Sequence, residues 1–206
     1  MSTIDYRPVS RILRQGGVIA YPTDTAYGLG ASVGSVKGIR KVFLIKGRKQ
    51  KNPISIVVSG LKQAREIALF DTQALRLWKK FMPGALTLVL PLKKYLRKRE
   101  NWSLLSGGTG TIGIRLPKHE VPIKLVRSLG APITTTSANL SGHPSLYSST
   151  PVVRHLGNRK YRPDIIVGGK KLRKKAISTV VDLSGQEVRI LREGGISKQK
   201  IIKALK

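Results

Sequence analysis

Residues 21–30, which read YPTDTAYGLG, limit the possible folds of this chain more than any other stretch of its sequence. They follow an apolar run at 18–21 that is typical of a buried strand, and this strand is expected to stop at Pro22, which has no amide proton for a sheet. The loop that follows carries four hydrogen-bonding side chains: Thr23, Asp24, Thr25 and Tyr27. Gly28 and Gly30 allow left-handed backbone angles or a close approach to a ligand. Polar groups at a strand end favour a binding site, and a plain turn is the alternative.

Apolar periodicity divides the rest of the chain into alternating helices and strands. Helices are predicted at 9–14, 36–46, 61–69, 72–82, 121–129 and 197–205. Strands are predicted at 54–58, 86–90, 111–116, 133–136, 165–167, 177–183 and 188–191, and loops at 93–101 and 141–151. The turn at 184–186 predicts a hairpin, which requires antiparallel pairing. The pattern therefore predicts an α/β fold: a single domain, 1–206, with a twisted mixed parallel and antiparallel sheet flanked by helices.

Composition excludes several kinds of site. The chain contains no cysteine, so disulfides, thiolate nucleophiles and cysteine-bound zinc are excluded, and a reducing cytoplasm is the expected setting. The histidines lack the spacing of metal ligands and are expected to be ordinary loop or surface residues: His119, His143 and His155. No apolar run approaches the roughly 20 residues of a membrane helix, and the N-terminus lacks a signal-peptide core, which predicts a soluble protein that is not exported.

Net charge is the most unusual property of the composition. The 39 Lys and Arg residues against 10 Asp and Glu give +29. A polyanion is the expected partner, and the alternative is an organism whose proteins are basic throughout. Two tracts that are too polar for a core carry many of these cations: Lys93, Lys94, Arg97, Lys98, Arg99, Lys170, Lys171, Arg173, Lys174 and Lys175. They predict a basic face that binds tRNA or another RNA through its phosphates.

The pattern of polar residues points to a site for anions. Several fall where predicted strands end: Thr23, Thr25, Ser137, Asn139, Ser178, Thr179 and Arg192. Lys46 and Arg48 lie at a helix exit, where both can turn toward one anion. Arg115 is set in the apolar strand TIGIRL, so it either points inward and needs an anionic partner or points to solvent. There is no Walker loop, no GxGxxG after a strand and no acid/base pair of carboxylates. Such a site suits phosphoryl or nucleotidyl transfer, which depends on positioning and charge stabilisation.

Seven motifs occur together in one order: YPTDTAYGLG, KGR followed by Asn52-Pro53, PGALTLVL, TIGIRLPKH, TTTSANLSG, STVVDL and ILREGGIS. From about residue 10 to 197, the chain thereby resembles the YrdC-like family of threonylcarbamoyl-AMP synthases, in the short single-domain form called TsaC, with a short helix after the matched part. The resemblance implies an enzyme that converts L-threonine, bicarbonate and ATP to threonylcarbamoyl-adenylate and pyrophosphate. Downstream transferase proteins then move the threonylcarbamoyl group to the tRNA adenosine beside the anticodon.

The resemblance also implies roles for individual residues. The Lys-x-Arg and Ser-x-Asn signatures supply the catalytic residues Lys46, Arg48, Ser137 and Asn139. The threonine site comprises Thr25, Arg115, Thr135 and Ser178, with Arg115 on the carboxylate. The ATP site comprises Arg48, Asn52, Thr111, Ser137, Ser145 and Arg192. Mg²⁺ is expected on the phosphates of ATP, and no metal is expected on protein ligands.

Two positions and two competing functions stay open. Val57 stands where many relatives place a histidine near the amino acid, which puts the usual mode of threonine binding in doubt. Asp24 is the nearest candidate for a general base, although an acidic residue in a Pro-Thr loop is more often a turn former. One competing function is a basic RNA-binding or assembly protein without catalysis, which the net charge supports. The other is a carbamoyl-transfer module, because hydrogenase maturation proteins share the fold within longer chains.

Overall fold

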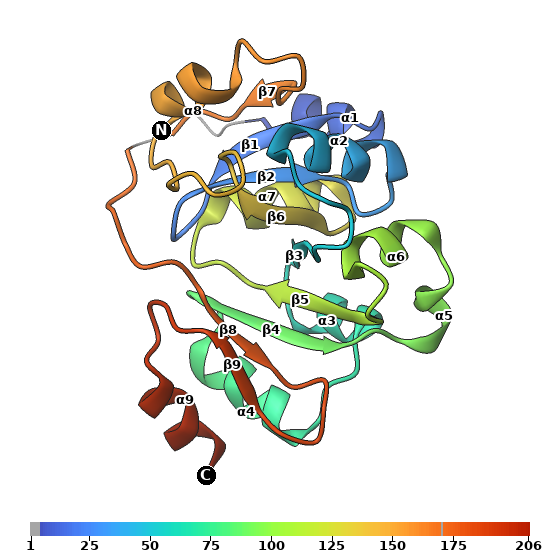
Figure 1. Ribbon diagram of the computed structural model, residues 1–206, viewed down its shortest axis with the longest axis vertical. Coiled ribbons are helices and arrows are strands. Elements are labelled where there is room, and N and C mark those ends of the chain that lie inside the picture. Colours follow the sequence, from blue (N-terminus) through green and yellow to red (C-terminus); the bar gives the residue numbers. More distant parts are fainter. Residues whose placement is uncertain (1–4, 170) are drawn as a thin grey trace.

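The computed structural model describes residues 5–169 and 171–206, in which nine strands form a mixed sheet. The strands are β1 (Val18–Pro22), β2 (Tyr27–Ala31), β3 (Ser55–Val57), β4 (Leu86–Pro91), β5 (Thr111–Arg115), β6 (Ile133–Ser137), β7 (Ile165–Ile166), β8 (Thr179–Asp182) and β9 (Arg189–Arg192). Their order in the sheet is β7-β1-β2-β6-β3-β5-β4-β8-β9. The pairs β1–β7, β3–β5 and β4–β8 are parallel and the others antiparallel. Figure 1 shows the strand direction turning between β1 and β9, so the predicted twisted, mixed sheet is confirmed.

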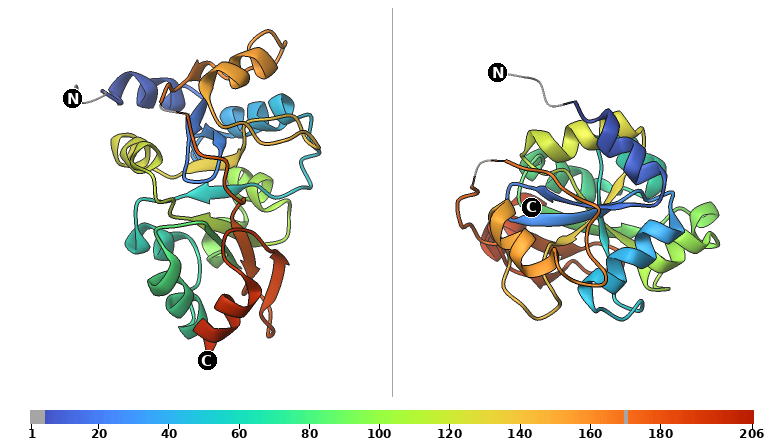
Figure 2. Two further views of the ribbon diagram at one scale, coloured as in Figure 1. Left: turned by 90° about the vertical axis from the view of Figure 1, so that its left-hand side faces the viewer. Right: turned by 90° about the horizontal axis from the view of Figure 1, so that it is seen from above.

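Helices flank this sheet on both sides. They are α1 (Arg7–Arg14), α2 (Val36–Lys46), α3 (Leu61–Ile67), α4 (Thr72–Phe81), α5 (Lys94–Arg97), α6 (Glu100–Ser106), α7 (Glu120–Leu129), α8 (Ser149–Leu156) and α9 (Lys198–Leu205). Figure 2 shows α1 and α7 side by side on one side of the sheet and α2 on the other. Ser35 and Ser197 cap α2 and α9, because the side chain of each accepts a backbone N–H of the first turn. Within the described ranges, no helix combines the length and apolar character needed to cross a membrane.

The core consists of two apolar clusters on opposite faces of the sheet. The larger cluster contains side chains of α2 and α4, and the smaller one lies beneath α1 and α7. Val57 belongs to the smaller cluster and is level with Arg115 on β5 and Ile133 on β6. Because strand side chains alternate between faces, these three residues share one face. One face of the sheet therefore carries both the apolar cluster beneath α1 and α7 and the polar side chain of Arg115.

Residues 21–30 belong to a hairpin, whereas the sequence predicts a strand that stops at Pro22 and a loop after it. Pro22 does end β1, but the turn is short and β2 returns beside β1 as an antiparallel partner. Gly28 and Gly30 are strand residues, and neither takes a left-handed angle. At Gly30 a β-carbon would lie 2.8 Å from Cε1 of Tyr21, so glycine makes room for the buried Tyr21 ring. The strand is hard to recognise in the sequence because glycine has a low strand propensity.

The basic segment at 93–101 is helical, which corrects the prediction of a solvated loop. It contains α5 and the start of α6. Leu96 is 5% exposed and Trp102 is 6% exposed, so two apolar side chains anchor the segment while most of its basic side chains stay at the surface. A helix with so few apolar positions carries little periodic signal.

A second helix starts inside a predicted loop. The loop was expected at 141–151, but α8 begins at Ser149 and buries Val152 and Leu156, which lie one turn apart. Two buried side chains in a short segment give too weak a periodicity for the sequence alone to reveal the helix.

Candidate active site

A cleft of about 1290 Å³ runs across β4, β5, β6, β8 and β9 and reaches the end of α2. All residues to which the family resemblance assigns a role line it: Thr25, Lys46, Arg48, Asn52, Thr111, Arg115, Thr135, Ser137, Asn139, Ser145, Ser178 and Arg192. Thr179, which the polar pattern also pointed to, lies outside the lining, where its buried Oγ1 donates to the backbone O of Ile196 at 2.6 Å. The fold thus brings together residues from almost the whole length of the chain.

The cleft carries a large excess of positive charge. Its cationic side chains are Lys46, Arg48, Lys49, Arg115, Arg189 and Arg192. Asp182 is the single carboxylate among the described lining residues, and it is already engaged. It accepts hydrogen bonds from the backbone N of Ser184 at 2.9 Å and its Oγ at 2.6 Å, and from Nη2 of Arg189 at 2.8 Å. A cleft with this balance attracts anions.

Lys46 joins the two predicted signatures at the end of α2. Its Nζ donates to the backbone O of Ser137 at 2.7 Å, to Ser137 Oγ at 3.2 Å and to Asn139 Oδ1 at 2.8 Å. Burial, with a smaller contribution from the charge of Arg48, lowers the pKa of Lys46 to about 8. Lys46 is therefore a fixed cation whose proton is held less tightly than that of an exposed lysine.

Arg48 follows α2 and lies beside Lys46 in the cleft wall. Burial lowers the pKa of its guanidinium, which nevertheless remains a cation at neutral pH. Three other predicted ATP contacts line the same cleft: Asn52, Thr111 and Ser145. Thr111 Oγ1 is 2.9 Å from Thr109 Oγ1, a further hydroxyl of the lining that the sequence did not single out.

Arg115 points inward, which decides between the two orientations that the sequence leaves open. Its Nη2 donates to Asp24 Oδ1 at 3.0 Å and approaches Thr25 Oγ1 at 3.4 Å. Asp24 is thus the anionic partner that a buried arginine requires. This pairing also corrects the view of Asp24 as the nearest general base, because its carboxylate is bound to Arg115 and lies outside the cleft lining.

Ser178 connects the predicted threonine and ATP subsites. Arg192 donates through Nε and Nη2 to the backbone O of Ser178, at 3.0 and 2.9 Å, and through Nη2 to Ser178 Oγ at 3.0 Å. Thr87 Oγ1 lies 3.0 Å from the same hydroxyl. Burial, followed by the charge of Arg115, lowers the pKa of Arg192. Sequence reasoning missed Thr87, although a lone hydroxyl in the apolar run of β4 is the signal that marks it.

Comparisons with known proteins show to which family the chain belongs. The family model Sua5/YciO/YrdC, described as "Telomere recombination", matches residues 11–194. The chain belongs to the Sua5/YciO/YrdC family. It is 34% identical to the threonylcarbamoyl-AMP synthase of Pyrococcus abyssi over 201 residues, which cover 97% of the chain and 56% of that relative. It is 35% identical to the threonylcarbamoyl-AMP synthase of Bacillus subtilis over 191 residues, which cover 92% and 53%.

A solved structure of a family member supports the same relationship. The crystal structure of P. abyssi Sua5 complexed with L-threonine matches with a TM-score of 0.88 and 33% identity, over 98% of the chain and 58% of Sua5. The chain spans about half the length of the P. abyssi and B. subtilis synthases.

Val57 is the position at which the sequence leaves the mode of threonine binding open. It is fully buried and level with Arg115 in the parallel β3–β5 pair, on the face that carries the cleft. Its side chain packs in the apolar cluster beneath α1 and α7 and lies outside the cleft lining. The position is therefore next to the predicted carboxylate clamp but offers it no hydrogen bond.

Histidines and metal ligands contribute little to the cleft. His143 lines it, with its ring centroid 5.2 Å from that of His155, and His119 caps α7 by accepting the N–H of Val121. Over residues 5–169 and 171–206, His, Asp and Glu side chains form no group of three that could hold a metal ion. The lining nevertheless fits Mg²⁺ as an ion delivered with nucleotide phosphates, because it offers several hydroxyls and the carboxylate of Asp182.

Proposed function

We propose that this chain forms L-threonylcarbamoyl-adenylate and pyrophosphate from L-threonine, bicarbonate and ATP. The observation that carries the proposal is the contact of Lys46 with Ser137 and Asn139 in a cationic cleft that also holds Arg115 and Arg192. Two relatives of known name are threonylcarbamoyl-AMP synthases, and a related structure is complexed with L-threonine. The lack of a carboxylate pair agrees with chemistry that depends on charge and positioning.

The reaction joins two anions, and this sets the task of the cleft. The deprotonated amine of threonine takes up carbon from bicarbonate, with loss of water, to give a carbamate. A carbamate oxygen then attacks the α-phosphorus of ATP, the bond to the bridging oxygen of the β-phosphate breaks, and pyrophosphate leaves. Lys46, Arg48 and Arg192 line the cleft, and we assign to them the task of offsetting the repulsion between carbamate and triphosphate. Arg115 is assigned to the threonine carboxylate, as a guanidinium fork suits.

Mg²⁺ is proposed as a companion of ATP. When bound, it neutralises part of the phosphate charge. Asp182 is the carboxylate that can contact such an ion, although its oxygens already accept from Ser184 and Arg189, so the phosphates must supply most of the ligands. The residues of this chain therefore bind the phosphates and orient the reacting groups, while the ion remains part of the nucleotide.

The decisive test is a pyrophosphate assay with the purified protein and Mg-ATP. Pyrophosphate release is expected to require threonine and bicarbonate together, because the carbamate is the nucleophile and neither component alone supplies it. ATP consumption should be negligible when either is left out. Equal release without them would show a simple ATPase and refute the proposal. Replacing both substrates by carbamoyl phosphate tests the carbamoyl-transfer alternative, and no turnover in any mixture would favour a binding protein.

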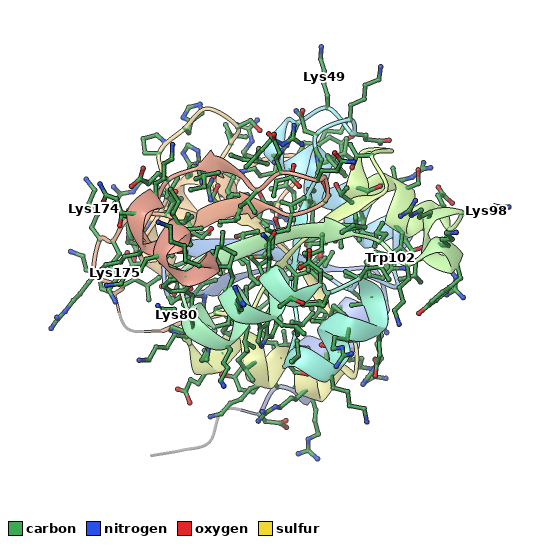
Figure 3. The ribbon with its side chains drawn as sticks, turned by 90° about the horizontal axis from the view of Figure 1, so that it is seen from below. Lys49, Lys80, Lys98, Trp102, Lys174 and Lys175 are labelled. Carbon is green, nitrogen blue, oxygen red and sulfur yellow. The ribbon has the colours of Figure 1, made fainter. Side chains whose placement is uncertain are left out.

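The product is proposed to serve tRNA modification together with downstream transferase proteins, and the basic tracts are the candidate tRNA contacts. Figure 3 shows Lys98 of the first tract and Lys174 and Lys175 of the second pointing outward on opposite sides of the molecule. They make two separate basic surfaces in place of the one face that the sequence predicts. Lys170 of the second tract lies outside the described residues.

Neutralising the first tract is expected to weaken tRNA binding without affecting adenylate synthesis. The variant Lys94→Gln/Lys98→Gln/Arg99→Gln spares Arg97, whose Nε donates to the backbone O of Leu92 at 3.0 Å. The plot of log affinity against log salt should become shallower by about 0.7 to 0.9 for each lost phosphate contact. Lys79→Gln/Lys80→Gln on α4 is a matched control. If the wild-type protein shows no salt-sensitive tRNA binding at about 50 mM salt, the tracts do not bind tRNA. The net charge would then be explained by an organism whose proteins are basic throughout.

A further inference from the structure

Asp24 lies in the turn between β1 and β2, and another part of the chain engages both of its carboxylate oxygens. Oδ1 accepts a hydrogen bond from Nη2 of Arg115 at 3.0 Å, and Oδ2 accepts one from the backbone N of Lys118 at 3.2 Å. Arg115 is the last residue of β5, and Lys118 follows three residues later. The turn is thereby tied to the end of the strand that carries Arg115.

Burial separates this ion pair from the others. The side chains of Asp24 and Arg115 are each 9% exposed, whereas those of Arg40 and Glu100 are 54% and 58% exposed. In every other ion pair of the described residues, at least one side chain is more than a quarter exposed. Water and salt weaken an exposed pair, but they compete little with a buried one. Solvent and salt therefore compete little with the contact between Asp24 and Arg115.

Arg115 still has donors to offer to a ligand. It lines the cleft, whereas Asp24 touches it from outside the lining. Its Nε is buried and has no hydrogen-bond partner in the part of the chain that the structure describes. Buried donors without partners are rare because they are costly, and one beside a cleft favours an acceptor on a bound molecule. Arg115 is thus paired through Nη2 and unsatisfied at Nε.

Among the residues that the structure describes, no neighbour of Arg115 other than Asp24 provides a counter-charge. Val57, which is level with Arg115 in the sheet, is apolar, and the contact with Thr25 Oγ1 is long at 3.4 Å. The charge of Arg115 acts unfavourably on Arg192, so two cations repel each other across this part of the cleft. Without Asp24 the Arg115 guanidinium would lose its counter-charge and its short contact together.

We propose that Asp24 is the positioning residue of the amino-acid subsite: its ion pair holds the Arg115 guanidinium so that the remaining donors meet the substrate carboxylate. The inference rests on the proposed function, which assigns threonine to this subsite. Asp24 acts through Arg115 and does not touch the substrate. Its negative charge also repels a bound carboxylate, so the proposal requires that fixing the guanidinium outweighs this repulsion.

Calorimetric titration of L-threonine and of Mg-ATP, each into the full chain, tests the proposal. Asp24→Asn is expected to weaken threonine binding by on the order of tenfold, because one amide oxygen cannot serve both Arg115 and Lys118, and to change ATP binding by less than about threefold. In an Arg115→Met background, Asp24→Asn should cause no further loss of threonine binding. Glu100→Gln, which removes the exposed carboxylate partner of Arg40, is the matched control and should leave both affinities unchanged.

The possible outcomes distinguish a failure of the positioning role of Asp24 from a failure of the proposed function. Threonine binding that is unchanged or tighter in Asp24→Asn, or a loss that persists in the Arg115→Met background, overturns the positioning role. If Asp24→Asn does not fold, Asp24→Glu decides, because it keeps the charge but displaces the guanidinium, and normal threonine binding by this variant refutes the proposal. A folded wild-type protein that binds no threonine overturns the proposed function and the inference with it.

Discussion

Alanine at Lys46 or Arg48 is expected to lower kcat for pyrophosphate release by a factor on the order of 10² to 10³, and to weaken ATP binding as well. Charge builds up at the α-phosphate as the carbamate attacks, and a fixed cation stabilises it most where water is excluded. Lys46 meets this condition, because it is 4% exposed and its Nζ is held by Ser137 and Asn139. The measurement is steady-state kinetics with threonine and bicarbonate saturating.

The pH dependence gives this prediction a second readout. Burial lowers the pKa of Lys46 to about 8 in the free protein, so its charge is present below that pH and is lost as pH rises through it. The kcat/KM for ATP should therefore fall above about pH 8, and this fall should be missing in Lys46→Ala. Lys37→Ala, an exposed lysine on the same helix, is the control and should behave as wild type. Near-normal kinetics for both alanine variants would show that Lys46 and Arg48 do not stabilise the charge at the α-phosphate.

The sequence predicts most of the fold because the strands carry local signals. β4 and β5 are apolar runs bounded by proline, glycine or polar residues, and the helix α4 has buried Leu77 and Trp78 on one face. Where the local signal is weak the prediction fails. The glycines of β2 make it read as a loop, and the charges of α5 conceal the single buried side chain of Leu96.

The membership of the cleft could be predicted, but its contacts could not. Sequence motifs identify Lys46 and Ser137, yet they lie 91 residues apart, and only the pairing of distant strands shows that they touch. The sequence left the orientation of Arg115 open because alternation along a strand does not show which face is buried. The pairing of Arg115 with Val57 of β3 and its contact with Asp24 show that it points inward. Thr87 joins the site for the same reason, through its position opposite β8.

Replacing Gly194 by alanine is expected to lower the free energy of unfolding by on the order of 3 kcal/mol and to weaken ATP binding. A β-carbon at this position would lie 2.0 Å from the backbone O of Ile177, so the strand end must move. Arg192, two residues earlier, would then lose its fixed contacts with Ser178. Denaturant unfolding and ATP titration provide the measurements. The matched control is Gly185→Ala in the β8–β9 turn, where a β-carbon meets no atom within 4 Å. If Gly194→Ala were as stable as this control, the explanation would be wrong. The close packing of the chain after β9 against the segment before β8 would then not be needed to hold Arg192 in the cleft.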